Sequence, residues 1–353
     1  MSRGADSSPQ DVASDPVEPT DDLDSGVSLP ELTEQVDLCL PNGRINPAAI
    51  GYSRRPLHRT NLSGWGRNKR WEYWGAVTPE LVVGMTISDL DYLKVHQLYV
   101  LDRAHDQEVV KDVLAPPWSS VMLPSGPGPI HATATTPQLS LSFADIPGGT
   151  KLTAHSARVD VELLAAGGQD SLAVVVPWGT TRFQYTVKDV ARPLSGTVTI
   201  DGRTITVTPG ESFAVLDRGR GRWPYSKKWN WGAGSGLSGG KRLGLQVGGK
   251  WTDGTGSTEN ALVVDGRLSY WPDELRWRYD LSDTSSPWQV QGEQVEATLT
   301  PFRVRAADTN AALVASSVRQ AFGTWSGRAV DSDGVEHSLD GLLGWAEEAS
   351  NRW

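Results

Sequence analysis

Residues 197–207 read TVTIDGRTITV, and this stretch predicts the fold more directly than any other part of the chain. Two arms in which residue types alternate flank Asp201-Gly202, a dipeptide typical of the tight turn whose twist matches a β-hairpin. Because side chains in a strand point alternately to opposite faces, this alternation is the signature of a half-buried strand. The stretch therefore predicts an antiparallel hairpin.

Short β-rich runs continue on both sides of this hairpin. Those before it are residues 71–77, 81–88, 95–101, 139–143, 151–157, 158–165 and 171–176. About eight more follow residue 210, with turn signals at Asp265-Gly266 and at 331–334, and about eight strands close a small barrel. The pattern predicts a short helix over 30–39, and a helix or loop over 308–318.

Length and strand spacing together predict an all-β protein of two lipocalin-like antiparallel β-barrel or sandwich domains in tandem. The chain has 353 residues, too many for one ordinary core. We place the boundary near Pro209-Gly210, which gives an N-terminal barrel-like domain over 30–210 and a C-terminal lipocalin-like barrel over 211–353. A disordered acidic tail is expected over 1–29, because this segment has almost no large apolar groups to bury.

Net charge and cysteine content narrow the classes of function. The formal net charge is -9, and the first 28 residues hold seven acidic residues against Arg3 alone, so the remainder is close to neutral. A near-neutral body gives no electrostatic reason to expect a nucleic-acid partner. Cys39 is the only cysteine, which excludes an intrachain disulfide and a cysteine-based zinc site.

Other compositional features bear on metals and membranes. The six histidines are scattered without local pairing, so we expect no metal site and no cofactor. No apolar run approaches the roughly 20 residues of a membrane span, and the N-terminus lacks the apolar stretch of a signal peptide. We therefore expect a cytoplasmic protein without an integral membrane segment, and the oligomeric state stays open.

The densest group of candidate functional residues lies in LDRGRGRWPYSKKWNWGAGSG (216–236). In a strand, the three alternating arginines would share one face, and the two later tryptophans would share another. One interpretation is a polar group at the bottom of an aromatic-lined pocket; the other is a structural Asp–Arg pair that plugs a barrel end. Composition slightly favours the second. The residues concerned are Asp217, Arg218, Arg220, Arg222, Trp223, Tyr225, Trp229 and Trp231.

Two other segments contribute candidates. Glu259 and Asn260 precede an apolar strand, where Glu259 is either an acid or base facing the pocket or half of a loop-capping pair. Trp74 lies in the strand-like run 71–77, on the same face as Glu72 and Ala76. Asp89 and Asp91 follow another strand and are interpreted as turn residues.

Three segments resemble a known family: 216–236, STENALVVDGRLSY (257–270) and FGTWSGRAVDSDGVEHSLDGLLGWAEE (322–348). They are similar to domain of unknown function 2804, a bacterial and eukaryotic family, over roughly residues 35–353. Asp217, Trp229, Trp231 and Glu347 also resemble, more distantly, positions in double-lipocalin proteins: tocopherol cyclase, carotenoid hydratase and AttH-like proteins. This resemblance implies two lipocalin-like halves. The run Arg218 to Arg222 departs from that pattern, so the chemistry of those enzymes is not carried over.

The first function hypothesis is a cofactor-independent hydratase, isomerase or cyclase acting on a lipid, isoprenoid or polyketide. Asp217 or Glu259 would be a proton donor kept neutral by an apolar wall, with Tyr225 assisting. An arginine beside Asp217 would lower its pKa and leave Glu259 as the better acid. Trp229 and Trp231 would stabilise a developing cation by about 0.5–2 kcal/mol each.

The second hypothesis is a non-catalytic binder of a hydrophobic small molecule. The three arginines would contact a carboxylate or phosphate headgroup, while tryptophans and Asn260 line the pocket. The third is a carbohydrate-binding β-sandwich, which would need surface-exposed tryptophans, whereas most of these lie inside alternating runs. The family likeness favours the first hypothesis over the second.

Overall fold

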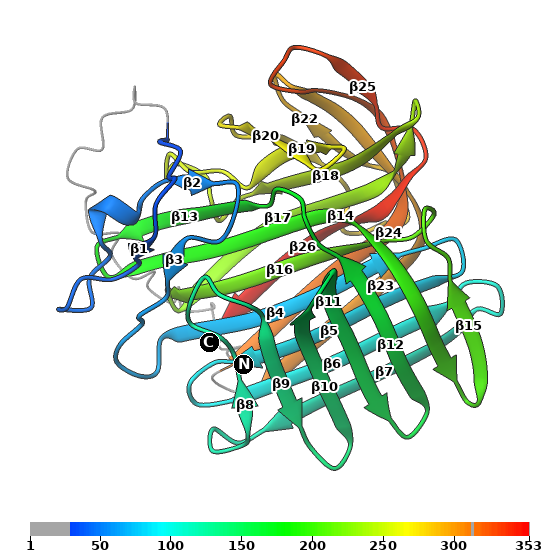
Figure 1. Ribbon diagram of the computed structural model, residues 1–353, viewed down its shortest axis with the longest axis horizontal. Coiled ribbons are helices and arrows are strands. Elements are labelled where there is room, and N and C mark those ends of the chain that lie inside the picture. Colours follow the sequence, from blue (N-terminus) through cyan, green and yellow to red (C-terminus); the bar gives the residue numbers. More distant parts are fainter. Residues whose placement is uncertain (1–28, 312–313, 353) are drawn as a thin grey trace, which may run out of the picture.

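The computed structural model describes residues 29–311 and 314–352, and this part of the chain is almost entirely β (Figure 1). One short 3₁₀ helix, η1 (Pro47–Ala49), is the exception, and no helix within the described ranges is long and apolar enough to cross a membrane. The predicted tail, apart from Leu29, lies outside the described residues. Two strongly curled antiparallel sheets confirm the predicted fold class.

Fourteen strands form the larger sheet, in the hydrogen-bonded order β7-β6-β5-β4-β16-β14-β12-β11-β10-β9-β8. Strands β13 and β15 also pair with β14, and β2 pairs with β13. The bounds are β2 (Tyr52–Ser53), β4 (Asn68–Val77), β5 (Leu81–Asp89), β6 (Lys94–Asp102), β7 (Gln107–Ala115), β8 (Val121–Met122), β9 (His131–Thr135), β10 (Leu139–Ile146), β11 (Gly149–Ser156), β12 (Val159–Ala166), β13 (Leu172–Gly179), β14 (Arg182–Ile200), β15 (Arg203–Val207) and β16 (Phe213–Arg222). A separate parallel pair joins β1 (Val36–Asp37) to β3 (His58–Arg59).

Ten strands form the smaller sheet, in the order β20-β19-β18-β17-β26-β24-β23-β22-β21, with β25 paired to β24. The bounds are β17 (Ser226–Ser238), β18 (Lys241–Gly249), β19 (Asn260–Val264), β20 (Arg267–Trp271), β21 (Arg276–Arg278), β22 (Trp288–Gln291), β23 (Val295–Ala311), β24 (Val314–Val330), β25 (Glu336–Ser338) and β26 (Leu342–Arg352). The chain passes from one sheet to the other between β16 and β17, whereas the domain boundary near Pro209-Gly210 stays a prediction.

Three of the five apolar clusters in the described residues concern how the two sheets are packed. One lies inside the larger sheet, between β4–β7 and β9–β12, and another lies inside the smaller sheet. The third lies between the two sheets, where Tyr99 and Val215 of the larger sheet belong to the same cluster as Phe322 and Trp345 of the smaller one. The two halves therefore share a core, and this contact positions the site described below.

Strand β14 is the element that allows the larger sheet to curl. Its first part pairs with β13 and β16, and its second part pairs with β12 and β15. The register shifts between Asp189 and Arg192, and Ala191 has a φ of 57°. A bulge of this kind bends a strand and increases its twist. The amide of Ala191 donates to Ser235 Oγ of β17 at 3.1 Å, so the bend also contacts the other sheet.

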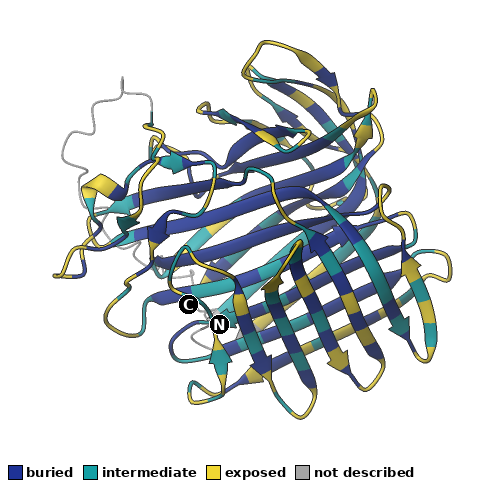
Figure 2. Cartoon of the chain, viewed as in Figure 1, coloured by how far each residue is buried: buried dark blue, intermediate teal, exposed yellow. Residues whose placement is uncertain are grey.

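The pattern of burial differs between strands, as Figure 2 shows. In β9–β12, buried residues alternate with more exposed ones, which is the period-two pattern of a sheet with one face in solvent. In contrast, residues of β13 and β16 and the first half of β14 are buried on both faces. Polar side chains on these central strands are therefore enclosed by protein.

The predicted hairpins are confirmed. Asp201 and Gly202 have φ values of 48° and 83° between β14 and β15, and Asp265 and Gly266 have 49° and 88° between β19 and β20. Asp91, with a φ of 70°, is a turn residue as predicted, and it accepts hydrogen bonds from the amides of Gly66 and Asn68.

Both helical predictions are wrong. Residues 30–39 contain β1, and the amides of Val36 and Leu38 donate to the carbonyls of Leu57 and Arg59. Pairing with a distant segment outweighs local helix propensity there. Residues 308–311 belong to β23 and residues 314–318 to β24, where Asp308 pairs with Ser317, so sheet pairing again decides the structure of the described residues.

Candidate functional site

Three buried carboxyl groups and one buried lysine meet where the larger sheet packs on the smaller one. Lys188 of β14 and Asp217 of β16 come from the larger sheet, while Glu347 of β26 and Glu259, just before β19, come from the smaller one. Less than one tenth of the surface of each of these four residues is exposed to solvent. We call these four residues the carboxylate cluster.

The lysine links the two sheets. Lys188 and Asp217 are register partners, and Lys188 Nζ lies 3.0 Å from Asp217 Oδ1. The same nitrogen lies 3.4 Å from Glu259 Oε1 and 4.4 Å from the ring centroid of Trp231. Burial alone would lower the pKa of Lys188, but the two carboxylates raise it, so the ammonium stays charged.

Each carboxyl group of the cluster accepts a hydrogen bond from a different indole. Trp71 Nε1 donates to Asp217 Oδ2 at 3.0 Å, and Trp251 Nε1 donates to Glu259 Oε2 at 2.9 Å. Trp229 Nε1 donates to Glu347 Oε1 at 3.1 Å. The indoles thus hold the three carboxyl groups in place while surrounding them with apolar ring surface.

The same indoles pack around one central ring, that of Trp223. Its centroid lies 5.6 Å from that of Trp71, 5.9 Å from that of Trp229 and 5.4 Å from that of Trp251. The fourth neighbour is Trp178, at 5.0 Å. We call these five residues the indole cluster. Trp223 and Trp251 are buried, whereas the other three are only partly buried and reach the surface.

Glycines make this packing possible. A Cβ atom on Gly219 of β16 would lie 2.1 Å from the ring of Trp71, so only glycine lets that indole lie across the strand and reach Asp217. A Cβ on Gly248 would lie 3.1 Å from Glu259 Oε2. Close approach of a ring to the backbone is the usual reason for glycine inside a strand.

Burial changes the protonation of two carboxyl groups. Enclosure raises the pKa of Glu347 from 4.5 to about 7, although Trp229 and the charge of Lys188 partly oppose this. Its other oxygen, Oε2, accepts from Gln320 Nε2 at 3.0 Å. Burial also raises the pKa of Glu259, against the opposing charge of Lys188. Since Lys188 is the one ammonium that contacts the cluster in the described chain, Glu347 is the group best placed to stay neutral near pH 7.

The structure separates the arginines from Asp217. Asp217 and Arg218 are adjacent in β16, so their side chains point to opposite faces. Arg218 Nε and Arg220 Nη2 lie 2.9 and 2.7 Å from Glu72 Oε1, inside the larger sheet. The sequence interpretation of an ion pair between Asp217 and an arginine is therefore wrong. The arginines pair with Glu72, and Asp217 pairs with Lys188.

The remaining predicted residues have structural contacts. Asn260 Oδ1 accepts from the Gly248 amide, and its Nδ2 donates to the Asp273 carbonyl. Trp74 belongs to the core of the larger sheet. Arg222 Nη1 donates to the Gly43 carbonyl, and the guanidinium of Arg67 lies 5.6 Å from the centroid of the Tyr225 ring. Of the predicted residues, the structure brings Asp217, Glu259, Trp223, Trp229 and Trp231 together.

Sequence patterns did not identify several residues of this site. Lys188 lies in a run, Phe183 to Val190, that is buried throughout. A charged residue within such a buried run indicates a buried ion pair, because an unpaired charge there would be costly. Glu347 was noted only through the family resemblance. Trp71, Trp178, Trp251 and Gln320 are far from Asp217 in sequence, and only the packing of the two sheets brings them near.

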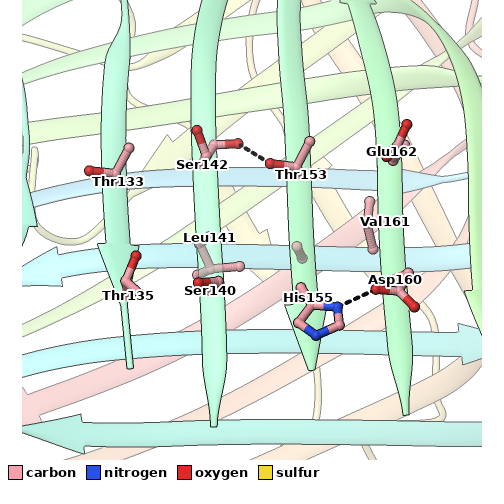
Figure 3. A pocket seen from close by; sticks show the side chains of 11 residues that line it. Thr133, Thr135, Ser140, Leu141, Ser142, Thr153, His155, Asp160, Val161 and Glu162 are labelled. Carbon is pink, nitrogen blue, oxygen red and sulfur yellow. Dashed lines mark hydrogen bonds and ion pairs between the residues drawn. The ribbon is translucent and has the colours of Figure 1, made fainter. Parts of the chain in front are cut away.

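A separate pocket of about 360 Å³ lies on the solvent face of β9–β12, and Figure 3 shows its hydroxyl-rich lining. His155 Nδ1 and Asp160 Oδ1 form a hydrogen bond there, and Thr153 Oγ1 donates to the Ser142 carbonyl at 3.4 Å. The His155 and Asp160 side chains are 75% and 58% exposed, and exposed pairs of this kind contribute little. The candidate site is therefore the enclosed cluster between the sheets.

Comparisons with known proteins bear on family and fold. The model of the family described as Domain of unknown function (DUF2804) matches residues 30–353, which confirms the predicted resemblance. No curated protein matches the sequence.

Several solved structures are similar to this chain. The crystal structure of CghA has a TM-score of 0.55 at 12% identity, covering 90% of this chain and 97% of CghA; that of CghA with Sch210972 has 0.53 at 11%, covering 81% and 88%. A putative AttH from Nitrosomonas europaea is also similar (TM-score 0.48, 15% identity, 80% and 92% covered). So is kievitone hydratase from Nectria haematococca (0.47, 11%, 82% and 89%). The likeness to CghA shows that the two chains share a fold.

Proposed function

The chain belongs to the DUF2804 family, and from the geometry of its carboxylate cluster we propose that it is an enzyme that protonates an unsaturated, largely apolar small molecule. Hydration, isomerisation and cyclisation are reactions of this class. The observation that carries the proposal is Glu347, a buried carboxyl group whose pKa is about 7 and which lies against an indole. A carboxylic acid that stays protonated near neutral pH is what a general acid requires.

The cluster supplies an acid and a base with different environments. Glu347 is the acid, and Asp217, which forms an ion pair with Lys188, is the base. In a hydration, the Glu347 proton adds to one carbon of a double bond, whose π pair forms the new C–H bond. Water then attacks the resulting cation, and its proton passes to the Asp217 carboxylate. Atoms and charge balance without any further reactant.

The indole cluster provides the surroundings that such a reaction needs. The faces of indole rings stabilise a positive charge that develops in an apolar environment, by about 0.5–2 kcal/mol per ring. Three carboxyl groups against one ammonium also make the site complementary to positive charge. The partly buried rings of Trp71, Trp178 and Trp229 lie where the cluster reaches the surface, and we propose that the substrate enters between them.

The fold comparison is consistent with a small-molecule ligand. CghA, whose fold this chain shares, was crystallised with the compound Sch210972. At 11–12% identity this likeness supports only the general idea that two curled sheets of this kind hold an organic molecule. The substrate class proposed here rests on the apolar, indole-lined walls of the site.

An isotope experiment tests the proposal without a known substrate. The purified protein is incubated with an extract of apolar metabolites in H₂¹⁸O or D₂O, and the extract is compared by mass spectrometry with one treated with Glu347→Gln. We expect at least one compound to gain ¹⁸O or deuterium with the wild type and not with the variant. Identical incorporation with both proteins, or none with either, would reject Glu347 as the acid.

A non-catalytic binder is the second candidate, and one observation favours it. Every carboxyl group of the cluster already accepts an indole hydrogen bond, so the site is satisfied without a reaction. A binder would carry an apolar molecule out of the extract unchanged, at equal amounts in the wild type and in Glu347→Gln. Native mass spectrometry of both proteins therefore separates the two functions.

A further inference from the structure

A second group of buried polar side chains lies on the other face of β16, inside the larger sheet, and the proposed reaction does not use it. Arg218 of β16, Glu72 of β4 and His96 of β6 lie in one row across the sheet. Arg218 pairs with Glu72, and Ile87 of β5 lies between Glu72 and His96. Trp74 lies two residues along β4 from Glu72, and Tyr185 of β14 pairs with Arg220. Trp74 belongs to the core inside the larger sheet, whereas Tyr185 packs on the same face against the N-terminal segment that contains Cys39 and Ala49.

This interior face carries more positive than negative charge. Arg218 and Arg220 are 3% and 1% exposed, yet both guanidinium groups approach the same oxygen, Glu72 Oε1. Farther along the face, Arg70 and Lys94 form ion pairs with Asp89, and Arg70 also pairs with Asp91. The residues named here, Arg218, Arg220, Arg70 and Lys94 against Glu72, Asp89 and Asp91, thus place four cations against three carboxylates. Burial, with added repulsion from Arg218, lowers the pKa of Arg220 to about 10.

The two arginines differ in how their N–H groups are satisfied. Arg220 donates to the carbonyls of Pro124 and Gly219 as well as to Glu72, and so fixes the segment that closes this end of the sheet. Arg218 makes no hydrogen bond with any residue of the described chain; its contact with Glu72 is an ion pair at Nε. A buried guanidinium normally uses most of its five donors, so the surroundings of Arg218 lack acceptors.

Other polar atoms on this face also have no hydrogen-bond partner within residues 29–311 and 314–352. Trp74 Nε1 and Glu72 Oε2 are two of them. Tyr185 Oη and the ring nitrogens of His96 also lack a partner in hydrogen-bond geometry, although the backbone of Leu57 and His58 acts on the Tyr185 oxygen and that of Val95 acts on His96. The charge of Arg218 is the strongest that acts on the Tyr185 phenol, which places the two groups within electrostatic reach. Buried polar groups in folded proteins are almost always paired, so several unpaired ones on one face indicate a ligand.

We propose that this face is a binding site for a small oxyanion, a carboxylate or phosphate group, whose principal ligands are the guanidinium of Arg218 and the hydroxyl of Tyr185. A planar guanidinium presents paired N–H donors that match such a group. The anion would neutralise the excess positive charge and supply the missing acceptors. This site is separated from the carboxylate cluster by the backbone of β16 and is independent of the proposed reaction.

The test uses the full chain in a buffer free of oxyanions, with inorganic phosphate and formate as probes. Isothermal titration calorimetry and thermal unfolding are measured for the wild type, Arg218→Met and Tyr185→Phe. The control is Arg328→Met, which makes the same change at an arginine that is 59% exposed and paired with Glu296 and Glu336. Tyr185→Phe removes a hydroxyl whose oxygen interacts with the backbone of Leu57 and His58, so its melting temperature in the anion-free buffer is measured as a separate control for folding.

We expect saturable binding of at least one probe at one site, with a rise in melting temperature. Tyr185→Phe should weaken binding about tenfold, the usual effect of losing one hydrogen bond to a charged group. Arg218→Met should abolish binding, and because it removes a poorly paired buried charge, it should unfold at no lower temperature than the wild type in the anion-free buffer. Arg328→Met should bind normally.

Two results would overturn this inference. One is the absence of saturable binding of either anion to the wild type. The other is binding that Arg218→Met and Tyr185→Phe leave unchanged, which would place the anion elsewhere on the protein. Since neither readout depends on turnover, failure here is distinct from failure of the proposed reaction.

Discussion

Lys188 Nζ lies 3.0 Å from Asp217 Oδ1, between register partners on neighbouring strands at the contact of the two sheets. The same ammonium reaches Glu259 of the other sheet at 3.4 Å. One lysine therefore links carboxyl groups from both halves, whereas Glu347 accepts hydrogen bonds from Trp229 and Gln320 and forms no ion pair within the described part of the chain. The charge of Lys188 therefore opposes only part of the effect of burial on Glu347, whose pKa is raised to about 7.

Replacing Lys188 should destabilise the protein strongly. In Lys188→Met, Asp217 and Glu259 lose their counter-charge while they stay buried, and breaking a buried pair in this way costs about 3–5 kcal/mol. Urea unfolding at pH 7 measures the loss. In Lys188→Met/Asp217→Asn one of the stranded charges is gone, so part of the stability should return. A loss below about 1 kcal/mol in the single variant would show that the pair is not enclosed.

Stability should fall as the pH rises toward 7, partly because of Glu347. Its pKa is about 7 in the folded protein and 4.5 as the ordinary value, so the folded state binds the proton more tightly. The stability from this proton is fully present below pH 4.5 and is lost as the pH rises through about 7. Each unit by which the pKa differs between the folded and unfolded states corresponds to about 1.4 kcal/mol of unfolding free energy.

The contribution of Glu347 is isolated by comparison with Glu347→Gln. Asp189, whose pKa burial raises to about 6, and Glu259 add to the same trend in both proteins. Urea midpoints between pH 4.5 and 8 should therefore fall less steeply in the variant than in the wild type. Parallel curves would contradict the assignment of a raised pKa to Glu347.

Adding a methyl group at Gly219 should displace Trp71. The new Cβ would lie 2.1 Å from the indole, so the ring must move and its hydrogen bond to Asp217 is lost. We expect Gly219→Ala to lose about 1–3 kcal/mol and to change the tryptophan fluorescence. Gly128→Ala is the matched control, because a Cβ there meets no atom within 4 Å. Equal stability of the two variants would refute the described packing of Trp71.

Removing the indole that donates to Glu347 should raise the pKa of this carboxyl group while leaving the group in place. Trp229 lowers the pKa of Glu347, so in Trp229→Phe the carboxyl group should hold its proton to a higher pH than in the wild type. For the reaction found by isotope labelling, the pH above which the rate falls should move upward. A downward shift, or no shift, would mean that the indole does not act on this carboxyl group.

Local sequence signals account for much of the fold and for little of the site. The hairpins at Asp201-Gly202 and Asp265-Gly266 follow from turn chemistry within a few residues. The strand at 36–37 pairs with residues 58–59, and residues 315–318 pair with the end of β26 as well as with the neighbouring strand β23, so local propensity predicted both segments wrongly. Asp217 and Glu259 were noticed as isolated acids next to apolar strands, but their partner Lys188 becomes visible only once β14 and β16 are paired.

The position of the arginines shows the same limit. Alternation along residues 218–222 places the three arginines on one face of a strand, yet it does not say which face meets the other sheet. That choice depends on Glu72 of β4, a strand about 150 residues earlier in the chain. The indole cluster likewise combines β4, β13, β17 and the segment after β18, and no local pattern joins them.

The central claim is that Glu347 is a neutral acid near pH 7, and direct titration of its carboxyl group tests this claim best. Carbon-13 NMR of protein labelled at glutamate Cδ is recorded from pH 4 to 9, and Glu347→Gln assigns the resonance. Our account predicts a carboxyl signal that titrates at about 7 and is missing in the variant. Titration of this signal at or below 4.5, the ordinary value for glutamate, would contradict it.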